Sequence, residues 1–323
     1  MKKIKARDFI YVASYIVVFI VSLFIGRLWF SPFGMNGINK IIFIDVRLPR
    51  AIIVSLAGAS LGLAGIAFQN LFRNYLAGPG ILGVTSGSAF GAVFAILIFQ
   101  FNPYLIQSSS FIFGIIAVVL AYKLGSLIGK GLLSLILAGM VVSAIFGGFI
   151  GLAKYLADPY NKLPTIVFWL LGSFSGIRWI DVEVSFLPMV IGIVGLISMR
   201  WVFNILSLGD EEATALGINA KRWRIAAIIL ATLCSSAATS VGGMIAWIGL
   251  VSPHIARLMT GVDNKKLVPM TAIVGAFLLL VCDTVARSLT ASEIPLSIVT
   301  DFVGAPILFI ILVKRRKMYY VKD

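Results

Sequence analysis

Long apolar runs, separated by short polar or charged stretches, occupy most of the chain. A helix needs roughly 20 apolar residues to cross the hydrocarbon core of a bilayer, and about ten runs approach that length. They cover residues 9–26, 48–71, 81–99, 109–122, 132–153, 184–203, 225–241, 244–255, 267–285 and 298–313. The pattern predicts an all-α fold, a polytopic integral membrane bundle of about ten transmembrane helices. The fourth and eighth runs are short, so one span fewer or one more stays open.

These spans leave no room for a separate soluble domain, so residues 1–323 are expected to form a single transmembrane domain. The composition agrees, with 60% hydrophobic and 12% charged residues and a mean hydropathy of +1.03. Soluble domains average roughly 45–50% apolar and 25% charged residues. Glycines four apart, as in Gly58/Gly62, Gly83/Gly87/Gly91 and Gly147/Gly151, are expected to let helices pack closely within the bundle.

The 27 Lys and Arg residues predict how the bundle is oriented. Short cytoplasmic loops of membrane proteins carry the positive excess. With about ten spans, most basic residues fall on one side if both termini are cytoplasmic, including Lys2, Lys3, Lys5, Arg7, Lys221, Arg222, Arg224 and residues 314–317. We therefore expect a multi-pass membrane protein with both termini in the cytoplasm. The net charge of +14 is then a topological signal and does not indicate nucleic-acid binding.

The sequence lacks the residues that nucleotide hydrolysis, catalysis or metal binding would require. The stretch GSLIGKG at 125–131 has neither the spacing nor the hydroxyl residue of a phosphate-binding P-loop. His254 is the single histidine, and Cys234 and Cys282 fall within predicted spans without forming a C-x-x-C pair. We expect no catalytic residues, no bound metal and no cofactor in this chain, so any ATP hydrolysis must reside on another chain.

The stretch RNYLAGPGILG at 73–83 interrupts two apolar runs. Its Gly78, Pro79 and Gly80 predict a helix break at membrane depth, which is tolerated only against protein or a water-filled cavity. An ordinary turn between helices is the alternative. Because small residues continue into the next predicted helix, we interpret the stretch as a gate element.

The stretch SLGDEEATALGIN at 207–219 predicts a short amphipathic helix at the cytoplasmic surface. Ser207 and Asp210 have the spacing of a capping box, and the acids Asp210, Glu211 and Glu212 suit the positive end of a helix. Gly217 is placed to end it. The helix is expected to expose Ala213, Thr214 and Leu216. A solvated connecting turn is the alternative, although a capped helix also suits a partner's groove.

Charged residues also lie within the spans or near their outer, non-cytoplasmic ends, and they allow more than one interpretation. Asp283 and Arg287 are four residues apart, so they share a helix face and are expected to pair. Intramembrane acids are also candidates for proton relays, and Asp283 or Asp301 would carry the proton in a secondary transporter. Arg47 and Arg50 open the second span in RLPR, where snorkelling of the guanidinium groups to the lipid headgroups is the simplest explanation.

Five stretches occur in an order that resembles a known family. They are RLPR at 47–50, RNYLAGPGILGVTSGSAFGA at 73–92, LGDEEATALGI at 208–218, GLVSPHIARLMTG at 249–261 and GAPILFIILVKRR at 304–316. Together they closely resemble the FecCD family, the permeases of iron-chelate and cobalamin ABC importers. The resemblance extends from about residue 10 to the C-terminus.

The resemblance implies a ten-helix permease of the bacterial or archaeal cytoplasmic membrane. It would work by alternating access as a homodimer or pseudodimer. Two cytoplasmic ABC ATPases, which bind ATP and Mg, would drive it, and a periplasmic or lipid-anchored substrate-binding protein would deliver the substrate. The stretch 207–219 would contact the ATPase. The family also handles haem, cobalamin and, in some branches, molybdate or tungstate, and a ferric siderophore is the first expectation.

The resemblance also gives roles to single residues. Asn74 and Leu76 would narrow the cytoplasmic end of the central pathway, although Tyr75 stands where the usual family form N-P-L-A has proline. Arg47, Arg50 and Arg287 match arginines that meet acidic residues on the two lobes of the binding protein. His254, in the segment P-H-I-A-R, is expected to be a structural residue.

Overall fold

A computed structural model describes residues 2–26, 37–99, 102–129, 131–290 and 292–320. Every regular element in these ranges is helical. The helices are α1 (Lys2–Phe24), α2 (Ile38–Ile41), the π-helical turn η1 (Ile42–Arg47), α3 (Leu48–Phe72), α4 (Val84–Ile98), α5 (Pro103–Ile128), α6 (Leu132–Leu156), α7 (Lys162–Leu170), α8 (Trp179–Ser198), α9 (Arg200–Leu206), α10 (Asp210–Ala215), α11 (Ala220–Gly242), α12 (Ile248–Thr260), α13 (Asn264–Ala286) and α14 (Leu296–Tyr320). The all-α expectation is confirmed for this part of the chain.

Each predicted span overlaps at least one of these helices, and the span 184–203 covers most of α8 and the first half of α9. Within the described residues, 6 helices are long and apolar enough to cross a membrane, namely the continuous helix Ile38–Phe72, α5, α6, α8, α11 and α13. The shorter apolar helices are Ile10–Phe24, Val84–Ile98 and Leu296–Ile311. The eighth predicted span is shifted along the chain to α12, because residues 244–247 lie outside any helix and the helix continues to Thr260. The count of about ten spans and the cytoplasmic side stay predictions.

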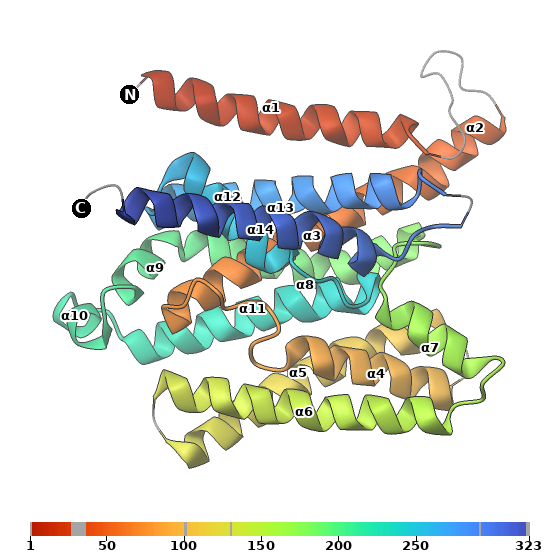
Figure 1. Ribbon diagram of the computed structural model, residues 1–323, viewed down its shortest axis with the longest axis horizontal. Helices are drawn as coiled ribbons and strands as arrows, with labels where there is room; N and C mark the ends of the chain where they lie inside the picture. The colour runs from red at the N-terminus through yellow and green to blue at the C-terminus, as the bar shows by residue number, and fades with distance from the viewer. Residues whose placement is uncertain (1, 27–36, 100–101, 130, 291, 321–323) are drawn as a thin grey trace.

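Most of the helices run side by side, and Figure 1 shows two ends of the bundle. Both chain termini and α10 lie at one end, which we call the α10 end. The elements α2 and α7 lie at the other, the α7 end. A common end for both termini agrees with the topology predicted from the basic residues.

The helix α3 is the centre of the bundle, and 21 of its 25 residues are buried. Glycines explain how it can be surrounded so closely. A Cβ on Gly58 would overlap the carbonyl of Gly275 on α13, and one on Gly65 would overlap the carbonyl of Gly249 on α12. At these points the backbones of the helices are in contact, which only glycine permits. The predicted packing role of Gly58 is therefore confirmed.

The third glycine set behaves differently from the other two. Gly87 and Gly91 lie against the backbone of α5, as expected. For Gly147 and Gly151 the expectation is wrong, because no described heavy atom comes within 4 Å of a Cβ placed on either residue. Both are exposed on α6. This face of α6 is consequently open to lipid or to another chain.

Candidate functional site

The stretch 73–83 breaks the helical path between α3 and α4 as predicted. Arg73 takes a left-handed conformation (φ 48°) and ends α3. The side chain of Asn74 accepts a hydrogen bond from the backbone N–H of Leu76 (2.9 Å), which closes a tight Asx turn. Leu76 is 60% exposed at the tip of this turn. The turn therefore offers a bulky apolar side chain that the rest of this chain does not cover.

The lengths of the two helices place the break within the bundle. The helix α3 has 25 residues and α4 has 15, so at 1.5 Å per residue α4 is about 15 Å shorter. The stretch 73–83 covers this difference. Its Pro79 lies against Gly249 of α12, where a Cβ would overlap the proline ring. Packing against protein is what an irregular backbone at membrane depth requires.

Side chains of α12 and α3 hold Tyr75, the residue that departs from the family form. The Nε2 atom of His254 lies 3.0 Å from the carbonyl oxygen of Tyr75. The guanidinium of Arg257 lies 4.3 Å from the centre of the Tyr75 ring and donates to Gln69 Oε1 (2.6 Å). These contacts agree with a structural role for His254. They also give Tyr75 a role that proline would not have, since its ring carries a cation–π contact.

The predicted surface helix exists as α10, with a different N-terminal cap. Ser207 donates its hydroxyl to the carbonyl oxygen of Asn204 (2.7 Å), so it does not cap α10 and the expected capping box is wrong. The cap residue is Gly209. A Cβ there would overlap the carboxylate of Glu212, which folds back over the cap. The helix begins at Asp210, whose side chain lies outside the described residues.

The C-terminal end of α10 matches the prediction. Gly217 has a φ of +78°. The N–H of Gly217 donates to Thr214 (2.9 Å), and the N–H of Ile218 donates to Ala213 (2.9 Å). This pair of bonds is a Schellman motif, which needs a left-handed residue after the helix.

The exposed surface of α10 differs from the expectation at one position. Ala213 is fully buried, whereas Glu211, Glu212, Thr214 and Leu216 are exposed. The alanine faces the bundle because α10 packs on α9 and α11. The helix thus presents acids and one leucine, with Ala213 as its anchor.

A chain of hydrogen bonds joins the segment before α10 to the end of α3. Asn204 of α9 donates to Asp263 (2.7 Å) and accepts from the backbone N–H of Asn264 (2.9 Å). The Asn264 side chain exchanges hydrogen bonds of 3.0 and 3.2 Å with Asn70 of α3. The donor from Asn204 lowers the pKa of the Asp263 carboxyl. We call Asn70, Asn204, Asp263 and Asn264 the asparagine link. Sequence reasoning missed it.

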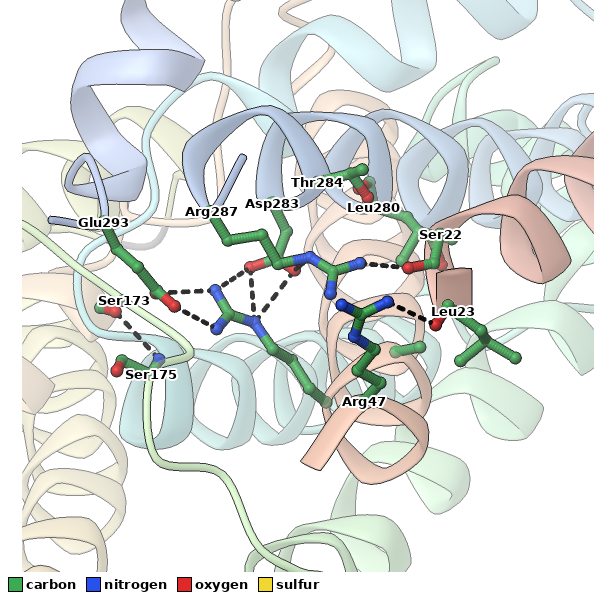
Figure 2. Close-up of polar contacts among 12 residues, drawn as sticks. Ser22, Leu23, Arg47, Ser173, Ser175, Leu280, Asp283, Thr284, Arg287 and Glu293 are labelled. Atoms are coloured by element: carbon green, nitrogen blue, oxygen red, sulfur yellow. Dashed lines mark hydrogen bonds and ion pairs between the residues drawn. The ribbon is translucent and has the colours of Figure 1, made fainter. Parts of the chain in front are cut away.

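A cluster of charged residues occupies the α7 end, at the meeting point of α1, α3 and α13 (Figure 2). The guanidinium of Arg50 binds Asp283 (2.8 Å) and Glu293 (2.8 Å). Arg287 Nε lies 3.6 Å from Asp283, which confirms the predicted pairing within α13. With Arg47, we call these residues the arginine cluster. The cluster as defined comprises three arginines and two acids, so one positive charge is in excess.

Two of the arginines cap a helix instead of reaching the lipid. Arg47 donates to the carbonyl oxygen of Leu23 (2.9 Å), and Arg287 donates to that of Ser22. These carbonyls belong to the last turn of α1, where backbone acceptors have no partner in the helix and cations are favoured. Arg47, Arg50 and Arg287 are only 6–8% exposed. The snorkelling interpretation is therefore wrong.

The acids of the last spans have clear partners. Asp283 is 1% exposed and lies between two guanidinium groups. Asp301 accepts a hydrogen bond from the indole of Trp247 (2.8 Å). Both contacts support structural roles. Among the described residues, no group of three or more His, Cys, Asp or Glu side chains is placed to hold a metal ion.

A cavity with a volume of about 900 Å³ opens at the α7 end. It lies between the start of α5, helix α7, residues 173–178 and the end of α11. Aromatic rings (Phe168 and Trp169), hydroxyl groups (Ser173, Ser175 and Ser240) and one arginine (Arg178) line it. A mostly apolar wall with a few polar groups is typical of small-molecule sites.

Comparisons with known proteins agree along almost the whole chain. The sequence profile of the FecCD transport family matches residues 14–314. The molybdate import system permease protein MolB of Haemophilus influenzae is 36% identical over 316 residues, which is 94% of each chain. The protein named Probable iron chelatin transport system permease protein in Helicobacter pylori is 37% identical over 277 residues, covering 86% of this chain and 84% of its own. A solved inward-facing structure of a metal-chelate type ABC transporter superposes with a TM-score of 0.90 at 38% identity, covering 95% of this chain and 98% of the other.

Proposed function

The chain belongs to the FecCD transport family, and from this premise we propose that it is the membrane permease of an ATP-driven importer for a metal chelate. The observation that carries the proposal is the whole-chain match to a metal-chelate transporter in sequence and fold together. The enzyme that hydrolyses ATP is a separate subunit. A second permease copy, two ATPases and an outer substrate-binding protein complete the assembly.

The helix α10 is the docking element for the ATPase. It lies at the same end of the bundle as both termini, and it exposes Glu211, Glu212 and Leu216. The anchor residue Ala213 and the Schellman motif at Gly217 fix its direction. A short rigid helix with a polar face and one apolar side chain suits a groove on a partner.

Replacing Gly217 with valine is expected to weaken ATPase association and ATP-dependent uptake together. A left-handed conformation costs a β-branched residue about 1–2 kcal/mol, so α10 would lose its end. No described atom lies within 4 Å of the new Cβ, so the effect arises from the backbone alone. Co-purification of the ATPase with the permease and uptake in proteoliposomes measure both results.

Gly176 provides the matched control. It has a φ of +76°, and again no described atom lies within 4 Å of an added Cβ, but it lies at the α7 end. Gly176→Val should therefore carry the same backbone strain and retain the ATPase. It is a control for ATPase association only and not for uptake, because Gly176 lines the cavity of about 900 Å³. Equal association of the parent and the Gly217→Val variant would remove α10 from the docking surface.

The turn 73–83 serves as the inner gate of the pathway. Leu76 is exposed at its tip, and the fold of the turn is fixed by Asn74 and by the contacts of Tyr75 with α12. Two permease copies would bring two such turns together. The exposed Leu76 at each tip would then narrow the pathway from both sides.

The arginine cluster supports binding-protein docking through an exchange of carboxylates. Arg50 is 7% exposed in this structure, and its outer side is covered by Glu293. The side chain of Glu293 is 22% exposed and lies in the loop before α14. We propose that an acidic residue of the binding protein displaces Glu293 from Arg50. The excess positive charge of the cluster favours the approach of that acid.

Replacing Glu293 with glutamine is expected to speed association of the binding protein several-fold at low ionic strength. The glutamine has no charge, so Arg50 loses one of its two acids and the cluster becomes more positive. Stopped-flow or surface-based association rates across a salt series measure the effect. Charge reversal of Arg47 and Arg50 is a poorer test, because it would also break their internal contacts.

An exposed acid at the same end controls for general charge. Glu183 lies on the first turns of α8, and Glu183→Gln changes the net charge by the same amount. It should leave association almost unchanged. If the binding protein associates with the Glu293→Gln variant at the parent rate or more slowly, the exchange of carboxylates is ruled out. The importer function itself is tested separately, by uptake with the unmodified chain.

The face of α6 around Gly147, Gly148 and Gly151 is proposed as part of the contact with the second permease copy. These glycines are exposed, and apart from the adjoining helix backbone no described atom lies within 4 Å of a Cβ placed on any of them. Helices in membranes associate through small residues that let backbones approach.

We propose a ferric siderophore as the substrate. The cavity of about 900 Å³ is at the upper end of the volumes that hold drug-sized ligands. A small oxyanion would leave most of it empty. Binding of ferric siderophore, haem, cobalamin and molybdate to the partner binding protein, followed by uptake of the tightest ligand, tests the assignment.

A further inference from the structure

A second cavity lies at the α10 end, between α5, α6 and α11. Its volume is about 470 Å³. Two cationic side chains, Lys221 and Arg224, form one side of it. The other lining residues are Tyr122, Gly125, Ser126, Gly129, Gly131, Leu132, Leu135, Ile225 and Ile228. None of the features assigned above uses this cavity.

The charge of the cavity is of one sign. No acidic side chain occurs among the described residues that line it. Lys221 and Arg224 also belong to the first turns of α11, a helix of 23 residues that begins at Ala220. The N-terminus of a helix carries a positive partial charge, which adds to that of the two side chains. The phenol of Tyr122 supplies a further donor, whereas the hydroxyl of Ser126 donates to the carbonyl oxygen of Lys123 (2.6 Å). An anion with several oxygens fits this set.

The apolar wall shows what the anion is attached to. Leu132, Leu135, Ile225 and Ile228 continue from the cationic side into the bundle. Trp223 is 39% exposed on the same turn of α11, and indole rings prefer the membrane interface. The cations are thus placed at headgroup level with the apolar wall deeper in the bilayer. A free phosphate ion would contact only the cationic side of the cavity and not its apolar wall.

We propose that this cavity binds an anionic phospholipid. Its phosphate lies between Lys221 and Arg224, and one acyl chain packs along Leu135 and Ile228. Basic pockets between transmembrane helices on the cytoplasmic side are suited to anionic headgroups. The site joins α11, which directly follows α10, to the α5–α6 pair. The proposal does not depend on which substrate the chain transports.

Native mass spectrometry of the purified full chain tests the proposal. The detergent-solubilised protein is mixed with phosphatidylglycerol or with phosphatidylcholine. We expect the parent chain to retain phosphatidylglycerol in preference to phosphatidylcholine. The double variant Lys221→Gln with Arg224→Gln should lose that retention by about tenfold or more, since each basic group near the surface contributes to headgroup attraction.

Two further variants keep the test decisive. Lys265→Gln with Lys266→Gln removes two exposed cations at the same end that do not line the cavity, and should retain the lipid. Leu135→Trp leaves both cations in place and fills the apolar wall, and should lose the lipid. Thermal stability and elution volume confirm that each variant is folded.

Three outcomes would overturn the proposal. Equal retention of phosphatidylglycerol by the parent and the Lys221/Arg224 variant would place the lipid elsewhere. Equal retention by the parent and Leu135→Trp, together with displacement of the lipid by inorganic phosphate, would make the cavity a phosphate site. Equal loss in the Lys265/Lys266 control would show that only general charge matters.

Discussion

Replacing Asp283 with asparagine is expected to cause a large loss of stability in the folded chain. Asp283 is 1% exposed and receives Arg50 at 2.8 Å and Arg287 at 3.6 Å. Removing its charge leaves three buried arginines with Glu293 alone. Removal of one partner of a buried ion pair costs about 3–5 kcal/mol. Thermal unfolding of the purified protein in detergent, followed by tryptophan fluorescence, measures the loss.

A second change should recover part of that stability. In Asp283→Asn with Arg287→Gln, one positive charge is removed along with the negative one, so the excess charge of the cluster returns to its original value. The double variant is expected to melt at a higher temperature than the single one. Asp301→Asn changes the same residue type at a hydrogen bond to Trp247, and should have a much smaller effect. A single variant as stable as the parent, or a double variant less stable than the single one, contradicts the charge argument.

Replacing Asn264 with alanine is expected to separate ATP hydrolysis from uptake. Asn264 is 3% exposed, and its side chain exchanges both hydrogen bonds with Asn70. Asn70 lies in the last turn of α3, directly before the gate turn, while Asn204 of α9 leads to α10. The asparagine link is thus a direct polar connection between the proposed ATPase contact and the proposed gate. Without it, uptake per ATP hydrolysed should fall by about tenfold, within the usual range of coupling between sites.

The control for this variant lies in the same region. Thr260→Ala removes a hydroxyl that bonds within its own helix, to Ala256 (3.0 Å), and should leave coupling intact. The double variant Asn70→Ala with Asn264→Ala should lose no more coupling than Asn264→Ala alone, because both changes break the same interaction between the two side chains. Additive losses, or an unchanged ratio of uptake to hydrolysis, would show that the link only holds the helices together.

Features that depend on neighbours in the sequence could be predicted from it. Apolar runs of sufficient length place the membrane helices, because burial of a whole helix in lipid requires such a run. Gly217 marks the end of α10, since a left-handed residue is needed there, and Gly78, Pro79 and Gly80 mark the break between α3 and α4. Asp283 and Arg287 pair within one helix as their spacing indicates.

One local prediction failed for a local reason. Ser207 has the spacing of a capping residue, but its hydroxyl finds the carbonyl oxygen of Asn204 in the preceding turn. Serine commonly bonds back to its own helix in this way. Which of these two partners the hydroxyl finds, a backbone N–H of α10 or the carbonyl oxygen of Asn204, depends on where α9 ends. The apolar pattern leaves that point open because it runs only to residue 203.

Only the tertiary structure decided which distant residues meet. Arg50 and Asp283 are separated by 233 positions, and Asn70 and Asn264 by 194. Periodicity identifies the face of each helix that is apolar, but not the rotation and depth at which two helices pack, and these set every polar contact between them. The same packing turned the arginines of the cluster inward, buried Ala213 and left Gly147 open. The sequence by itself therefore determined a membrane bundle with a helix break and a surface helix, and the packing of its helices determined the arginine cluster and the asparagine link.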